Sequence, residues 1–123
     1  NSLAYSFLVN SRLGLVAEGS SIEKEYIHNK NNIDTHAKKL EILKTTNPEK
    51  YYGEDGNISR DLIQSLNIKN AELETKRAEI TEGLESLTSA ITMSSPNCLA
   101  NLLLNFLVIL VIKSLRFSNF NLL

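Results

Sequence analysis

A repeat of mostly apolar residues with an average spacing of 3.5 residues covers much of this chain and restricts it to long helices. The first repeat steps alternately by four and three residues from Leu8 to Leu43, and a second repeat with the same steps runs from Leu66 to Ile91. This spacing lines the repeated residues along one side of an α-helix, where such a seam faces a partner helix. The sequence therefore predicts two long helices that pack along these seams.

Neither seam is apolar throughout. The first seam consists of Leu8, Arg12, Leu15, Gly19, Ile22, Tyr26, Asn29, Ile33, His36, Leu40 and Leu43, and the second of Leu66, Asn70, Leu73, Arg77, Ile80, Leu84, Leu87 and Ile91. The exceptions in the first seam make it an imperfect one. Its unbroken register favours one continuous helix across Gly19, although Ser20 and Glu23 have the spacing of a capping box that would let a helix restart.

Turn signals separate the two seams. Asn47-Pro48 and Asp55-Gly56-Asn57 both favour turns, and Pro48 can also open a single helical turn at its first position. We therefore expect residues 45–58 to form a loop. Ser59 is a plausible N-cap for the helix that follows.

The predicted fold class is all-α, a long antiparallel helical hairpin with coiled-coil-like packing and apolar N-terminal and C-terminal helical segments. The hairpin occupies residues 1–95, with helices over about 3–44 and 60–92. Residues 96–123 are expected to form a hydrophobic C-terminal helix and a short basic tail. Two helices alone bury little apolar surface, so a third element or a second chain is expected to complete the core.

The charged residues are distributed very unevenly. Lys113 and Arg116 are the only charged residues after Pro96, and no acidic residue follows it. The segment from Met93 to Ile112 carries no charge and reaches the length of about 20 residues that a membrane span needs. It is interpreted as a membrane anchor, as a helix buried in an oligomer or filament core, or as the product of a shifted or non-native reading frame.

Asparagines recur every four residues within the apolar C-terminal segment. Asn97, Asn101 and Asn105 therefore lie on one face of a helix. An amide in apolar surroundings is costly unless it is hydrogen-bonded, and in membranes such residues join helices. The stripe predicts that this helix packs against another one.

No pattern of catalytic or metal-binding residues stands out. His28 and His36 lie eight residues apart, which does not match the spacing of a metal-binding pair on a helix, and the chain has one cysteine. The chain lacks phosphate-binding glycine motifs, and its net charge of -1 gives no reason to expect nucleic-acid binding. We predict a protein that is not an enzyme and needs no cofactor, metal or small-molecule substrate.

Two functions fit these features. The first is a structural, self-assembling protein whose apolar terminal helices form the core of an oligomer or filament, with a second copy or a helical protein as partner. The alternative is a hairpin interaction module held in a membrane by a single span. Both readings place the protein at a membrane or in a secreted assembly. The residues predicted to mediate assembly are Leu84, Leu87, Ile91, Asn97, Asn101 and Asn105, with Tyr51 and Tyr52 at the loop tip.

Overall fold

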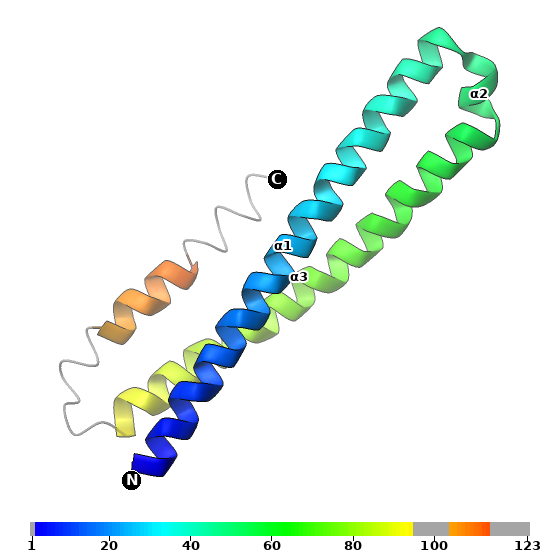
Figure 1. The fold of residues 1–123 in the computed structure, drawn as a ribbon. Helices are drawn as coiled ribbons and strands as arrows, with labels where there is room; N and C mark the ends of the chain where they lie inside the picture. Colours follow the sequence, from blue (N-terminus) through cyan, green and yellow to red (C-terminus); the bar gives the residue numbers. More distant parts are fainter. Residues whose placement is uncertain (1, 95–103, 114–123) are drawn as a thin grey trace. The chain divides into compact units, whose positions relative to one another are not determined.

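The protein is built from long helices. The computed structural model describes residues 2–94 and 104–113, and these residues contain no β-strand. Helix α1 spans Ser2–Thr46, the short helix α2 spans Pro48–Tyr52, and helix α3 spans Glu54–Ser94 (Figure 1). A further helix covers residues 104–113. The predicted all-α class is confirmed, and α1 and α3 form the two arms of a hairpin.

Helix α1 continues through Gly19, as the unbroken seam predicted, so no new helix starts at Ser20. A Cβ atom at position 19 would lie 3.6 Å from Cγ2 of Ile80 on α3, and one at Gly83 would lie 3.1 Å from Cδ1 of Leu15. Both glycines therefore lie where the two helices approach closely.

The connection between the arms is much shorter than the predicted loop over residues 45–58. Only Asn47 and Gly53 lie outside the helices there. Asn47 acts as the N-cap of α2, because its side-chain oxygen accepts a hydrogen bond from the Lys50 backbone N–H at 3.2 Å. Pro48 occupies the first turn, where its missing N–H costs nothing, so the alternative of a single helical turn at Pro48 is the correct one.

The second turn signal is wrong, because Asp55-Gly56-Asn57 lies inside the first turns of α3. Gly56 is buried against the backbone carbonyl of Tyr51, and a Cβ at this position would overlap that oxygen. Here glycine permits close packing between α2 and α3 and does not form a turn. Ser59 is not an N-cap either, since α3 already begins at Glu54 and Ser59 is fully buried within it.

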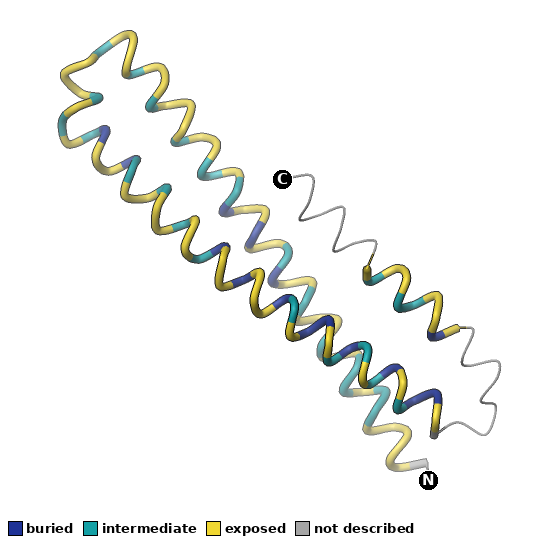
Figure 2. Tube along the Cα trace, turned by 180° about the vertical axis from the view of Figure 1, so that it is seen from behind, coloured by how far each residue is buried: buried dark blue, intermediate teal, exposed yellow. Residues whose placement is uncertain are grey.

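Both predicted seams are the buried sides of their helices. Every predicted seam position, from Leu8 to Leu43 on α1 and from Leu66 to Ile91 on α3, is buried or half-buried (Figure 2). The burial of polar members along with the apolar ones indicates that helical spacing, rather than residue type alone, decides which side faces inward. Coiled-coil packing of the side chains in the strict sense stays a prediction.

The chain divides into two compact units. Residues 22–76 form the first, here called the hairpin unit. The second, here called the terminal unit, is the described part of residues 1–21 and 77–123. Each unit contains a stretch of α1 and a stretch of α3, and the helix 104–113 belongs to the terminal unit.

In the hairpin unit, the polar exceptions in the seams meet across the helices. Nδ2 of Asn29 donates to Oδ1 of Asn70 at 3.0 Å, and both side chains are buried. Nδ1 of His36 lies 3.1 Å from the Ser59 hydroxyl. Residues further along α1 thus contact residues earlier in α3, which is the antiparallel order. Pairing of buried polar groups at seam positions favours one register over its neighbours, because a shifted register would leave these groups unpaired.

Replacing Asn70 alone with leucine is expected to lower the free energy of unfolding by about 1 to 3 kcal/mol, since the buried Asn29 amide would lose its partner. The double change Asn29→Leu with Asn70→Leu removes both polar groups and is expected to recover most of that loss. Urea unfolding followed by helical circular dichroism measures both. A double variant that is no more stable than Asn70→Leu would contradict the pairing.

Candidate assembly surface

The helix 104–113 is attached to the terminal unit by a buried asparagine. Nδ2 of Asn105 donates hydrogen bonds to the backbone carbonyl of Thr88, at 3.1 Å, and to the hydroxyl of Thr92. Oδ1 of Asn105 accepts a hydrogen bond from the Arg12 guanidinium at 3.3 Å. One side chain therefore connects this helix to both arms. The predicted pairing of Asn105 with another helix is made within the same chain.

A stripe of buried threonines lies on the side of α3 that Asn105 contacts. Thr81, Thr88 and Thr92 are buried beside the seam. The hydroxyl of Thr81 donates to the Arg77 carbonyl at 2.9 Å, and that of Thr92 donates to the Thr88 carbonyl at the same distance. These bonds to the preceding helical turn satisfy hydroxyls that would otherwise be costly to bury.

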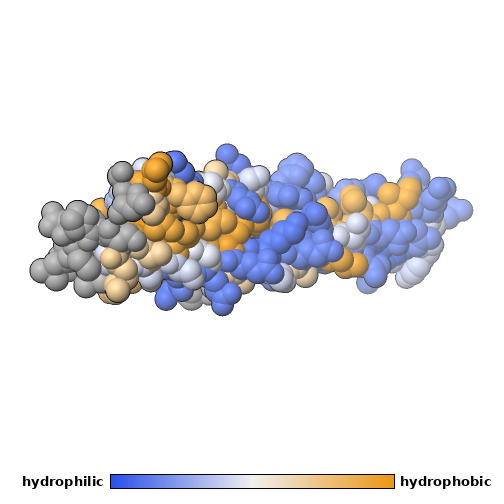
Figure 3. Space-filling view, turned by 90° about the horizontal axis from the view of Figure 1, so that it is seen from below, coloured by the Kyte–Doolittle hydropathy of each residue, from blue (hydrophilic) through white to orange (hydrophobic). Residues whose placement is uncertain are grey.

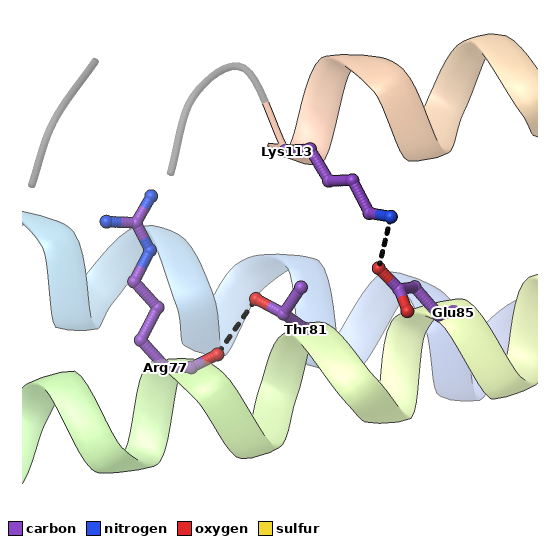
Figure 4. Close-up of polar contacts among 4 residues, drawn as sticks. All are labelled: Arg77, Thr81, Glu85 and Lys113. Carbon is purple, nitrogen blue, oxygen red and sulfur yellow. Dashed lines mark hydrogen bonds and ion pairs between the residues drawn. The ribbon is translucent and has the colours of Figure 1, made fainter. Parts of the chain in front are cut away.

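An ion pair joins α3 to the C-terminal end of the helix 104–113. Nζ of Lys113 lies 3.6 Å from a Glu85 carboxylate oxygen, with Glu85 one turn after Thr81 on the same face of α3 (Figure 4). Both side chains remain substantially exposed, so solvent screens the attraction and the pair contributes little stability. The pair joins the end of the helix 104–113 to α3.

Large apolar side chains remain exposed on the terminal unit even though one side of the helix 104–113 is packed. On α1 they are Leu3, Tyr5, Phe7, Leu13 and Val16, and on the helix 104–113 they are Leu104, Phe106, Leu107, Leu110 and Val111. We call these ten side chains together the outer apolar surface, although Leu3 and Phe7 lie about half a helical turn away from Tyr5 and Val16 on α1. Figure 3 shows a broad group of apolar side chains on the visible face and smaller apolar groups among the polar side chains elsewhere on it. Most monomeric proteins avoid such exposure.

The outer apolar surface carries no charge of its own. Arg12 is the only charged residue in residues 2–17, and it is half-buried and bonded to Asn105. On the helix 104–113 the only charged residue is Lys113, at its end. Helices that are apolar on all sides are normally covered on all sides.

The seam residues predicted to mediate assembly lie in the core of the terminal unit. Leu84 and Ile91 are buried, and Leu87 is half-buried. Asn97 and Asn101 lie outside the described residues, as does Cys98. Whether any of these residues contributes to assembly stays a prediction, but the two buried ones contribute to the fold of the single chain.

The two tyrosines near the turn behave differently from each other. Tyr51 is half-buried: the Arg60 guanidinium lies 5.1 Å from its ring centre and donates to its backbone carbonyl at 3.0 Å. Tyr52 is 73% exposed and makes an edge-on contact with the Tyr51 ring, with ring centres 4.8 Å apart. Only Tyr52 presents most of its surface to solvent, and its proposed role as a contact stays a prediction.

Sequence reasoning missed the residues that receive the helix 104–113. Arg12 interrupts the predicted apolar seam, and the threonines lie outside that seam. Their spacing was a usable signal, because Thr81, Thr88 and Thr92 recur at intervals of seven and four residues, which places them on one side of a helix. A second inward-facing stripe next to a seam indicates a third packed helix.

Two further features follow from the described residues. None of the helices in residues 2–94 and 104–113 combines the length and hydropathy needed to cross a membrane. The candidate span from Met93 to Ile112 lies partly outside these ranges and stays a prediction. Within the same ranges, no group of three or more histidine, cysteine or acidic side chains is arranged to hold a metal ion.

The described residues define an all-α protein built on a helical hairpin, with the further helix 104–113 packed against α1 and α3 in the terminal unit. Comparison with known proteins finds no family model, no curated protein and no solved structure that matches the chain. Its function therefore has to be argued from its own residues.

Proposed function

We propose that this protein is a non-enzymatic, self-assembling structural protein whose outer apolar surface is covered by a second copy of the same chain. The observation that carries the proposal is the exposure of ten large apolar side chains on two helical segments joined through Arg12 and Asn105. Covering such side chains is favourable by about 25 cal/mol for each Å² removed from water. Coiled-coil-like packing between the two arms of the hairpin belongs to the same proposal.

The absence of charge on the outer apolar surface supports a second copy as the occupant. A symmetric pair of copies brings the same surface patch together with itself. Any charged residue near the symmetry axis would therefore face the same charge on the other copy. The described residues of this surface carry no such charge. Self-pairing therefore meets no like-charge repulsion.

The charges of the terminal unit favour protein over lipid. The exposed or half-buried acidic side chains of the terminal unit are Glu18, Glu79, Glu82 and Glu85. Among the described residues, the exposed or half-buried basic side chains of this unit are Arg12 and Lys113. Helices that lie on anionic membranes carry lysine and arginine along their polar face, whereas acidic side chains outnumber basic ones in the described part of this unit. The membrane-anchored module remains the alternative that the following experiment distinguishes.

Replacing Leu107 with glutamate tests the proposal. Leu107 is 58% exposed on the outer face of the helix 104–113, so the change should leave the single chain folded. A carboxylate at a contact between copies would have to be buried without a partner, which is strongly unfavourable. We expect the dissociation constant between copies to rise at least about tenfold, which corresponds to 1.4 kcal/mol. Analytical ultracentrifugation of the full chain measures it.

Ile68→Glu is the matched control, because Ile68 is 56% exposed on α3 in the hairpin unit. It should associate like the unchanged chain. A full chain that is monomeric without detergent, or that associates equally well with either glutamate, would refute self-assembly through this surface. Flotation of a monomeric chain with neutral lipid vesicles would support the membrane alternative instead.

A further inference from the structure

The helix 104–113 is apolar both on the side that packs against the terminal unit and on the side that faces outward. Its inner side consists of Asn105, which is buried, and of Val108, Ile109 and Ile112, which are half-buried. These four residues have the i, i+3, i+4, i+7 spacing of one helix face, and the exposed residues of 104–112 are leucine, phenylalanine and valine. Because the hydrophobic effect has no direction, it does not by itself decide which side of this helix packs inward.

Asn105 is the one polar side chain among residues 104–112, and it meets groups that match both ends of its amide. Its Nδ2 donates to the Thr88 carbonyl and to the Thr92 hydroxyl, and its Oδ1 accepts from the Arg12 guanidinium. A rotation of the helix by one residue position, about 100°, would separate Asn105 from these groups. If Asn105 then lay at a covered surface, its amide would remain unpaired, which is unfavourable.

The groups that hold Asn105 do not depend on it for their own hydrogen bonds. The Thr88 carbonyl also accepts from the Thr92 hydroxyl at 2.9 Å. Arg12 is half-buried, so its guanidinium can extend toward solvent while its stem stays packed. A leucine at position 105 is therefore expected to remove the orientation of the helix without removing stability. Single asparagines in the cores of coiled coils act in this way, since they fix the register at a cost in stability.

We propose that Asn105 is a positioning residue that fixes the rotation and register of the helix 104–113, and thereby determines which apolar side chains this helix offers to a second copy. The first half of this inference concerns a single chain, and the second half rests on the proposed self-assembly. With Asn105 facing inward, Leu107 and Leu110 are among the exposed side chains. A helix free to rotate would present a changing set of side chains, so copies would associate in more than one way.

Cross-linking between α3 and the helix 104–113 tests the positioning role within one chain. Nζ of Lys113 and a carboxylate oxygen of Glu85 lie 3.6 Å apart. A background of Glu85→Cys, Lys113→Cys and Cys98→Ala leaves two thiols, which a short bismaleimide should join within single chains at low protein concentration. Adding Asn105→Leu is expected to lower the rate about threefold or more, because the original orientation becomes one of several with similar free energy.

Ile109→Leu in the same background is the matched control. Ile109 also lies on the inner side of the helix, and this change keeps the side chain apolar and leaves Asn105 in place. It should cross-link at the unchanged rate. An Asn105→Leu rate equal to that of the control would overturn the proposal.

Thermal unfolding and sedimentation distinguish a positioning role from a purely structural one. Asn105→Leu should unfold at the same temperature as the unchanged chain or higher, yet form a mixture of associated species where the unchanged chain forms one. A lower unfolding temperature combined with one uniform associated species would also overturn the proposal. If the unchanged chain is monomeric, self-assembly is refuted, and the cross-linking rates still decide whether Asn105 positions the helix.

Discussion

Replacing Gly56 with alanine is expected to lower the free energy of unfolding by about 2 to 4 kcal/mol, a large effect for the addition of one methyl group. The new Cβ would overlap the Tyr51 carbonyl oxygen, which is backbone and cannot rotate away as the end of a side chain can. Either α2 or the first turn of α3 would have to shift. Urea unfolding followed by circular dichroism measures the loss.

Gly14→Ala is the matched control for Gly56→Ala. Gly14 lies inside α1, and a Cβ there would meet no atom within 4 Å. Because alanine favours a helix over glycine by about 1 kcal/mol, this variant is expected to gain stability. If both alanine variants changed stability in the same direction, close packing at Gly56 would not be the cause.

Leu73→Ala is expected to lower the free energy of unfolding by about 2 to 5 kcal/mol. Leu73 lies in the α3 seam within the hairpin unit and is only 2% exposed, so its removal leaves a cavity between the arms in addition to losing buried apolar surface. The same urea unfolding experiment measures this loss. Thermal unfolding should show a clear drop in midpoint.

The same substitution at Leu62 serves as the control. Leu62 belongs to α3 and to the hairpin unit, but it is exposed rather than buried. Leu62→Ala should change stability by about 0.5 kcal/mol or less, the usual range for surface substitutions. Comparable losses at positions 62 and 73 would show that the seam is not the core of this unit.

The long helices and their inward sides could be predicted from the sequence because helical spacing repeats over many turns. The 3.5-residue seams identified buried positions even where the residue was Asn29 or Arg77, since periodicity fixes direction regardless of residue type. The pairing of Asn29 with Asn70 could not be predicted in the same way. Each helix indicates which side is buried but not which residue it will meet.

The turn was predicted less well because its signals are ambiguous. Glycine at position 56 is typical of a turn, yet here it permits a close approach between α2 and α3. Only the position of the Tyr51 carbonyl distinguishes the two roles, and that is a tertiary feature. The sequence predicted two apolar terminal segments but not the outer apolar surface. It does not indicate which side of each segment packs inward when Asn105 bonds to α1 and α3.

The polar contacts between helices differ greatly in the length of chain they enclose. His36 and Ser59 are separated by 23 residues, Tyr26 and Glu74 by 48, and Arg12 and Asn105 by 93. Loop-closure entropy rises by about 0.6 kcal/mol for each doubling of length, so the last contact costs about 1.2 kcal/mol more than the first if made from an open chain. Once the contacts nearer the turn exist, most of that entropy has already been lost. For the two contacts between α1 and α3, this order provides a route by which the hairpin unit can close progressively outward from its turn.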